Sequence, residues 1–319
     1  MARTFAFIFF LCLTGAANAR AETAVEAFAK LEAGEYAKAF EIANPLAQAG
    51  DADAMHLTGF LYENGLGVER DMALAVELYA AAGAKGQADA QFSLGELSLS
   101  GEGVKQDAAT AAGWYRLAGK QGHARAKLRL GVMHMRGDGV ETDKAQAMKL
   151  FTEAAAQGEA EAMRNLAIAY MSGDGVMKSH RTAGEWFEKG AAAGDPVSAY
   201  NLGLMLQSGA LGVPDLDAAA AQMRAAAEAG FGPAMTGLGL LIHRGAKADE
   251  SPADWFERAA RADDPQGRFL YAVALSEGDG REVDLASALV LVDDLLADEA
   301  APPELKAQAK KLKARLKRR

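Results

Sequence analysis

Residues 162–194, AMRNLAIAYMSGDGVMKSHRTAGEWFEKGAAAG, contain a pattern that recurs along most of the 319-residue chain. Its outline returns upstream as AKLRLGVMHMRGDGV (126–140), AQFSLGELSLSGEGV (90–104) and AMHLTGFLYENGLGV (54–68). The first residue of the pattern, here called the anchor, recurs every 36 residues, at Ala54, Ala90, Ala126, Ala162, Ser198 and Ala234. Self-similarity at a fixed period of this length is typical of solenoids, so the period predicts a repeat protein.

Each repeat is predicted to form two helices. Apolar residues four and eight positions after the anchor, such as Leu166 and Tyr170, lie on one helical face. In the Gly173-Asp174-Gly175 turn, the first glycine suits a left-handed helix end and the second lets the chain turn back sharply. A second helix then leads to an aromatic pair, Trp186-Phe187 in this repeat. Short connections make neighbouring helices antiparallel, which predicts an all-α solenoid of about seven two-helix repeats.

A glycine stands at the fifth position after the anchor in most repeats. The positions are Gly59, Gly95, Gly131, Gly203 and Gly239, and Ala167 is the exception. Glycine inside a helix costs about 1 kcal/mol relative to alanine. We therefore expect a neighbouring helix to approach so closely at these positions that a Cβ atom would not fit.

The start of the chain, MARTFAFIFFLCLTGAANA, has the layout of a secretory signal peptide over residues 1–19. Arg3 precedes an apolar run from Phe5 to Leu13, and a small-residue triplet places cleavage near Ala19. A membrane anchor is the other interpretation, but the run is well short of the roughly 20 apolar residues that a span needs. We expect a periplasmic or secreted protein. Its mature chain has no thiol chemistry, because the only cysteine, Cys12, leaves with the signal.

The remaining chain is expected to divide into three parts. Residues 20–50 resemble a degenerate half repeat that forms an N-terminal cap, since terminal repeats of an array are usually atypical. Residues 51–297 form the repeat array, which decays towards its end, where Gly267 replaces the anchor alanine. Residues 298–319 form a basic C-terminal helix or tail.

Charge is unevenly distributed along the chain. The net charge is −9, yet eight Lys or Arg residues between Lys306 and Arg319 oppose a single acid, Glu304. An acidic body argues against nucleic acid as a partner, because phosphate binding requires clustered basic residues. No second apolar run approaches the length of a membrane span, so none is expected in the mature chain.

The C-terminal helix carries an apolar stripe, Leu305, Ala309, Leu312 and Leu316, within basic surroundings. The stripe is interpreted either as a cap that covers the last repeat or as part of a peripheral contact with anionic lipids or an acidic partner.

Through the motif AxxxLGxxYxxGxGV…WF…AAxxG, over about residues 36–295, the chain resembles the Sel-one-like repeat (SLR) family, a branch of the tetratricopeptide-like solenoids. The resemblance implies a right-handed α/α solenoid superhelix. It also implies a non-catalytic adaptor or scaffold that binds a protein or peptide, as exported bacterial members do. One branch has been described as binding or hydrolysing β-lactams, but its members are cysteine-rich, and this chain departs from that pattern. A hydrolase of that branch and an envelope structural protein tethered by the basic tail remain as alternatives.

The sequence shows no constellation of catalytic or metal-binding residues. The histidines, His56, His123, His134, His180 and His243, form no His-Glu-x-x-His pair or ligand cluster. The Gly-x-Gly turns follow helices and lack the lysine of a phosphate loop, and one aspartate per turn is too few for calcium. No Gly-x-Ser-x-Gly motif is present. We therefore expect no enzyme activity, cofactor or metal.

The predicted binding site is a second apolar strip on the first helices, at positions two, six and nine after the anchor. If first helices line the concave side, as in tetratricopeptide-like proteins, this strip is a groove for an extended peptide or a helix. If the first helices need two buried faces, the strip is core. Methionines in the strip favour the groove, since Met suits adaptable surfaces. The candidate protein-binding residues are Phe92, Leu128, Val132, Met135, Arg164, Ile168, Met171, Tyr200 and Leu204, with Leu99, Arg129 and Arg136 nearby.

Overall fold

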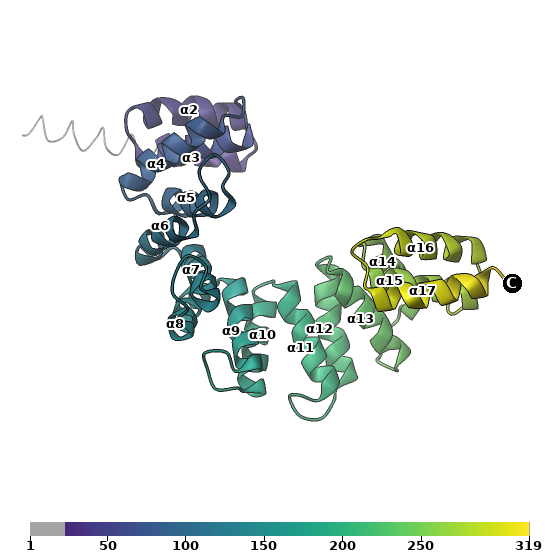
Figure 1. The fold of residues 1–319 in the computed structure, drawn as a ribbon. Coiled ribbons are helices and arrows are strands. Elements are labelled where there is room, and N and C mark those ends of the chain that lie inside the picture. Colours follow the sequence, from purple (N-terminus) through teal and green to yellow (C-terminus); the bar gives the residue numbers. More distant parts are fainter. Residues whose placement is uncertain (1–22, 319) are drawn as a thin grey trace, which may run out of the picture. The chain divides into compact units, whose positions relative to one another are not determined.

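A computed structural model describes residues 23–318, in which every regular element is an α-helix. The predicted signal peptide, residues 1–19, lies outside the described residues. The chain divides into two compact units, one that ends at Glu159 and one that begins at Ala160 (Figure 1). None of the described helices is long and apolar enough to cross a membrane.

The first unit contains a helix at residues 23–32 and seven longer helices. These are α2 (Tyr36–Gln48), α3 (Ala52–Asn64), α4 (Met72–Ala84), α5 (Ala88–Ser100), α6 (Ala108–Lys120), α7 (Ala124–Arg136) and α8 (Lys144–Ala155). The second unit contains α9 (Ala160–Ser172), α10 (His180–Ala192), α11 (Pro196–Ser208), α12 (Leu216–Glu228), α13 (Gly232–His243), α14 (Pro252–Arg261), α15 (Pro265–Glu277), α16 (Leu285–Ala297) and α17 (Pro303–Leu316).

The described helices from α3 to α16 form seven consecutive pairs, each a first helix packed against the second helix that comes after it. The odd-numbered helices α3 to α15 are the first helices of the repeats, and the even-numbered helices α4 to α16 are the second helices. This arrangement confirms the all-α solenoid of two-helix repeats.

The two turn glycines have different structural roles. The first ends the first helix in the left-handed region, as at Gly137 with φ +83°. The second also has positive φ, +68° at Gly139, and in addition it touches the preceding repeat. A Cβ atom on Gly139 would lie 2.3 Å from the carbonyl carbon of Ala108, at the first turn of α6. The second glycine therefore lets the turns at Gly67, Gly103 and Gly139 pack against the start of the previous second helix, a contact that the sequence did not reveal.

The second helices begin with a side-chain cap at a constant place in the repeat. The cap side chain accepts a hydrogen bond from a backbone N–H group in the first turn of the helix, which satisfies a donor that would otherwise lack a partner. From α4 to α16 the capping residues are Asp71, Asp107, Asp143, Ser179, Asp215, Ser251 and Asp284.

The glycine at the fifth position after the anchor, present in five of the described first helices, lies against a large side chain of the paired second helix. A Cβ atom on Gly95 would lie 2.4 Å from the ring of Tyr115, and one on Gly131 would lie 2.7 Å from the ring of Phe151. Ring-carbon contacts are comfortable near 3.5–4.0 Å, so neither position has room for a methyl group. The predicted close approach of a neighbouring helix is confirmed. Where Ala167 replaces the glycine, it packs in one cluster with Phe187.

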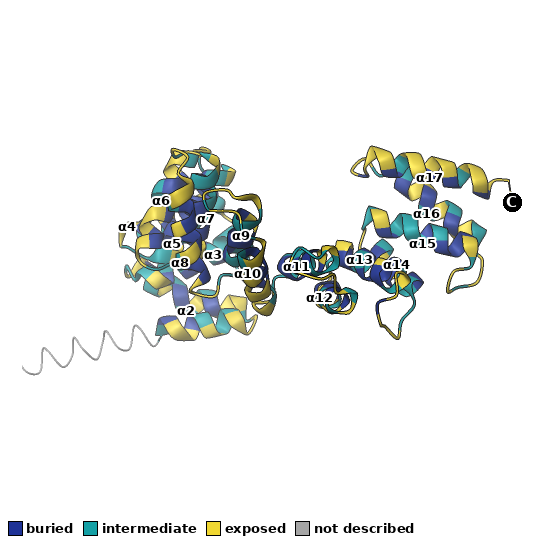
Figure 2. Ribbon diagram, turned by 90° about the horizontal axis from the view of Figure 1, so that it is seen from below, coloured by how far each residue is buried: buried dark blue, intermediate teal, exposed yellow. Residues whose placement is uncertain are grey.

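The C-terminal helix α17 covers the last repeat. Its apolar residues, Leu305, Ala309, Leu312 and Leu316, are all buried in a cluster with residues of α15 and α16. Its opposite side is exposed (Figure 2). The apolar stripe is therefore used as a cap, and the outer face of α17 carries mostly Lys and Arg.

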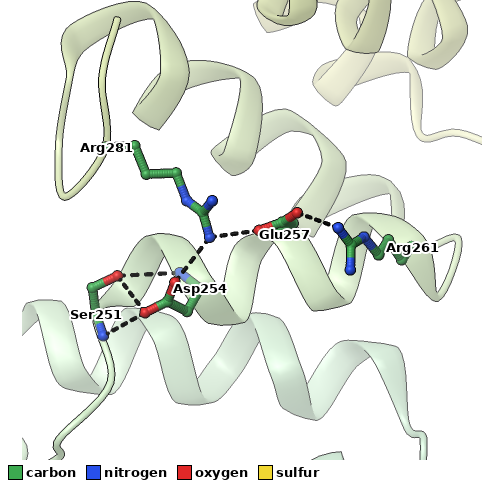
Figure 3. Close-up of polar contacts among 5 residues, drawn as sticks. All are labelled: Ser251, Asp254, Glu257, Arg261 and Arg281. Atoms are coloured by element: carbon green, nitrogen blue, oxygen red, sulfur yellow. Dashed lines mark hydrogen bonds and ion pairs between the residues drawn. The ribbon is translucent and has the colours of Figure 1, made fainter. Parts of the chain in front are cut away.

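A polar cluster ties the last turn of the array to α14 (Figure 3). Arg281, in the turn between α15 and α16, contacts Asp254 at 2.8 Å and Glu257 at 2.5 Å through Nη2. Asp254 also forms a capping box with Ser251, and the pKa of its carboxyl is lowered chiefly by the hydrogen bond from that hydroxyl. The guanidinium of Arg281 also lies over the ring of Tyr271, 5.3 Å from its centre. Arg281 thus connects α14 and α15 to the turn that comes after them.

Replacing Arg281 with alanine is expected to lower the free energy of unfolding by about 1–2 kcal/mol, because two partly buried carboxylates lose a shared donor. Urea denaturation followed by circular dichroism measures the change. The matched control is Arg261→Ala, which removes a largely exposed partner of the same Glu257 and should cost less than about 0.5 kcal/mol. Equal losses in the two variants would contradict the role assigned to Arg281.

Candidate functional site

The predicted strip runs along the first helices, and the structure gives its three positions different environments. In the first unit, Phe92 and Leu128 are buried, while Val132 and Met135 are half-buried. The ring of Phe92 stacks on His123 at 4.7 Å between centres, and the guanidinium of Arg125 lies 5.0 Å from it. This part of the strip is covered by side chains of the chain itself.

The strip is more open in the second unit. The residues Ile168 and Leu204 are 41% and 38% exposed to solvent, which is high for aliphatic residues in the middle of a helix. Met171 and Tyr200 are half-buried. Leu240 of α13, which is 37% exposed, lies at the same repeat position and was missed from the sequence, although it follows Leu204 by one period. Ile168, Leu204 and Leu240 are here called the apolar row.

Position two after the anchor is occupied by contacts between successive repeats. Its residue meets the residue that precedes the next first helix: Phe92 stacks on His123, and Tyr200 meets Phe231 edge-on at 5.4 Å. The same pair of positions forms an ion pair and a hydrogen bond in other repeats. Those partners are Arg164 with Asp195 at 2.5 Å, and Thr236 with Asp264 at 2.6 Å. Position two therefore forms a seam between successive repeats, and in the second unit position six is the exposed position.

Of the three arginines in or near the candidate strip, Arg129, Arg136 and Arg164, two are engaged within the chain. Arg164 binds Asp195 and also contacts Glu161 at 3.3 Å. Arg129 contacts Glu96 at 3.2 Å. Arg136 is exposed at the end of α7. Arg164, a predicted site residue, is thus a stacking residue of the second unit in this structure.

An open hollow of about 560 Å³ lies beside the apolar row in the second unit. Two of its lining residues follow residues of the apolar row along the chain: Met171 comes three residues after Ile168, and Arg244 comes four residues after Leu240. Residues three or four apart lie on one helical face, so the hollow is nearer the carboxyl ends of the first helices than the row is. Thioether and aliphatic groups line it together with amides, and no carboxylate is among them. The lining residues are Met171, His180, Asn201, Leu204, Met205, Gln207, Ser208, Ala210 and Arg244.

A second hollow, of about 440 Å³, lies on the first helices of the first unit and has a different character. Its lining residues are His56, Phe60, Glu63, Asp89, Phe92, Ser93, Glu96, His123 and Arg125. Two of its carboxylates already have partners, since Glu63 accepts the Tyr79 hydroxyl at 2.5 Å and Glu96 accepts the Tyr115 hydroxyl. Burial, with a smaller effect of each carboxylate, raises the pKa of both tyrosines.

The histidines of this hollow are structural. His123 accepts a hydrogen bond from the backbone N–H of Ala126 through Nδ1, so its Nε2 can donate to Asp89 at 3.3 Å. This bond lowers the pKa of Asp89 to about 2. His56 is half-buried, and burial lowers its pKa. Within residues 23–318 no three His, Cys, Asp or Glu residues are placed to hold a metal ion. The described side chains of this hollow therefore provide a charged surface, and both of its histidines are used within the fold.

The lowered pKa of His56 predicts that acid destabilises the first unit. An unfolded chain takes up the proton near the ordinary value of 6.5, whereas the folded chain resists it until a lower pH. Stability is therefore full above about pH 6.5 and falls as the pH drops from there towards the folded pKa. His56→Phe introduces the residue found at this repeat position one period later, Phe92. In this variant the free energy of unfolding should depend less on pH between about pH 7 and pH 5. Urea midpoints between about pH 7 and pH 5 test it, and an unchanged slope in the variant would contradict it.

Comparison with known proteins places the repeats in a described family. The Sel1 repeat family model matches residues 52–87, 88–123, 124–159, 160–195, 196–231 and 232–264. A Sel1 repeat protein from Oxalobacter formigenes is 28% identical, with a TM-score of 0.67 over 74% of this chain and 96% of that one. A protective antigen of uropathogenic Escherichia coli with an SLR fold is 24% identical, with a TM-score of 0.59 over 86% and 68% of the two chains. No curated protein matches the chain.

Proposed function

Because the chain belongs to the Sel1 repeat family, we propose that it is a non-catalytic scaffold that binds a protein or peptide on its first helices. Sel1 repeats generally mediate protein interactions, which supports this class of function. The observation that carries the proposal is the apolar row, in which three successive first helices of the second unit expose an aliphatic side chain at the same repeat position.

The exposure of this row is unusual for its place in the fold. Single exposed apolar residues are common on protein surfaces, but apolar residues that recur beside a hollow are typical of interaction sites. The corresponding residues of the first unit, Phe60, Glu96 and Val132, are half-buried, so repeat stacking does not require an exposed side chain here. A peptide laid across the first helices would cover the row and bury its side chains.

The predicted signal peptide supports a further part of the proposal, that the scaffold acts in the periplasm or outside the cell. Peripheral contact of α17 with an anionic surface would depend on its outer Lys and Arg residues, because its leucines are used in the cap. Salt would weaken such a contact, since it lacks an apolar component.

The test compares immobilised wild-type chain with row variants in a pull-down from the periplasmic extract of the source organism. A partner retained by the wild type should be lost roughly tenfold in Leu204→Asp/Leu240→Asp, because a charge replaces each apolar contact. Leu117→Asp is the matched control, since Leu117 is an aliphatic residue that is 45% exposed on α6, a second helix that carries no residue of the row. Capture that is equal for the row variant and the wild type, or no partner under several growth conditions, would refute the proposal.

A further inference from the structure

We propose that the hollow beside the apolar row, lined by Met171, Leu204 and Arg244, binds a peptide segment that carries aliphatic side chains and an acidic side chain, with Arg244 as the partner of the carboxylate. This inference rests on the proposed function, and it adds the chemistry of the partner. The lining of the hollow, the lack of an ion-pair partner for Arg244 among the described residues and the contrast with the hollow of the first unit support it.

The lining divides into an apolar part and a polar edge. Met171, Leu204, Met205 and Ala210 supply thioether and aliphatic surface from α9, α11 and the turn after α11. Methionines adapt their shape to different ligands, which suits a peptide side chain of no fixed rotamer. Leu204 also belongs to the apolar row, so a segment seated in the hollow continues along the row. An aliphatic side chain of the partner is the natural occupant of this part.

Arg244 is the charged group at the polar edge. It comes directly after α13, is exposed, and forms no ion pair with any described residue. Other arginines of the same unit bind carboxylates: Arg224 makes two contacts with Glu250, at 2.9 and 3.0 Å, and Arg281 binds Asp254 and Glu257. A free guanidinium in a chain with a net charge of −9 leaves its bidentate donor edge available to a ligand.

The local field of the hollow favours a carboxylate. The carboxyl end of α13 carries a partial negative charge, but the full charge of Arg244 at that end exceeds it. His180 is the first residue of α10, so the hollow also adjoins the positive end of a helix dipole. No acidic residue is among those that line the hollow. The first-unit hollow, by contrast, contains Glu63, Asp89 and Glu96, so the two hollows would not prefer the same peptide.

The proposal can be tested by selecting displayed random peptides on the purified full chain, with subsequent affinity measurement by fluorescence polarisation. Enriched peptides should combine aliphatic residues with an Asp or Glu. Changing that acid to its amide, or Arg244 to Glu, should weaken binding roughly tenfold or more. A peptide with Lys in place of the acid should recover binding to Arg244→Glu alone. Arg116→Glu, an exposed change on α6, is the charge-matched control and should bind as the wild type does.

The outcomes separate this inference from the proposed function. If Leu204→Asp abolishes binding of the selected peptides but Arg244→Glu does not, the row binds peptides and the acidic preference is wrong. Peptides enriched without an acidic residue overturn the inference in the same way, and so does the absence of any enrichment. Circular dichroism of each variant excludes loss of fold as the cause of weaker binding. Reversal of charge preference by Arg244→Glu would establish Arg244 as the carboxylate partner.

Discussion

Replacing Gly139 with alanine should destabilise the first unit by about 2–5 kcal/mol. Two costs combine: a left-handed backbone with a side chain costs about 1–2 kcal/mol, and overpacking typically costs a further 1–3 kcal/mol. The second cost is unavoidable, because the new Cβ atom would lie 2.3 Å from the backbone of Ala108, and a backbone atom cannot rotate away. Urea denaturation monitored by circular dichroism gives the value.

Gly158→Ala is the matched control. Gly158 also has a positive φ, +90°, but a Cβ atom there would meet no atom within 4 Å. It should show only the conformational cost, about 1–2 kcal/mol. If both variants lose the same stability, then the second turn glycine is needed for its conformation alone and not for contact with the preceding repeat.

Gly95→Ala should destabilise the same unit by about 1–3 kcal/mol, although alanine is the better helix former. The added methyl group would lie 2.4 Å from the ring of Tyr115. That ring is buried, and its hydroxyl is bonded to Glu96, so it cannot move without breaking a hydrogen bond. Thermal and urea unfolding, with the Tyr115 environment followed by near-ultraviolet circular dichroism, measure the effect.

Gly113→Ala provides the opposite expectation within the same pair of helices. Gly113 lies inside α6, has no positive φ, and has no atom within 4 Å of a built Cβ. Alanine should therefore stabilise the unit by about 0.5–1 kcal/mol through helix propensity. Opposite signs for two Gly-to-Ala changes would demonstrate that helix packing, and not the glycine itself, sets the sequence requirement. Stabilisation by both would contradict the packing explanation.

The solenoid could be predicted from sequence because its determinants are local and repeated. A mid-helix glycine with its known cost indicates close packing of a neighbouring helix without any structure. The structure then identifies the partners, Tyr115 for Gly95 and Phe151 for Gly131. The contact of Gly139 with Ala108 was not predicted. It joins residues of different repeats, and nothing in the turn itself distinguishes a glycine needed for φ from one needed for space.

The candidate strip could be only partly predicted. Periodicity identifies the face on which Phe92 and Ile168 lie, but exposure at that face depends on what the next repeat places over it. The ring of Phe92 is covered by His123, which in the sequence is an isolated histidine near a loop. Ile168 and Leu204 remain over a third exposed. The position and hydrophobicity of a residue can be read from the sequence of one repeat, whereas its burial depends on the side chains of the neighbouring repeat.

Arg244 illustrates a different limit. Its sequence context, a basic residue at the end of a helix, indicates a helix end and nothing more. The structure makes Arg244 a candidate binding residue for two reasons. Its guanidinium has no ion-pair partner among the described residues, and the hollow that it lines contains no carboxylate. Neither property can be read from a single chain position.

The seam contacts at position two affect which repeats can dock on one another in a chain of similar repeats. Repeats that are nearly alike could dock on the wrong neighbour, skipping a repeat or exchanging with another copy. The seams are of three chemical kinds: aromatic pairs at Phe92–His123 and Tyr200–Phe231, an ion pair at Arg164–Asp195, and a hydroxyl–carboxylate bond at Thr236–Asp264. A skipped repeat would place Arg164 against Phe231 and leave a charge without its partner. The differences between seam contacts therefore favour docking of each repeat on its native neighbour over docking on the next repeat along.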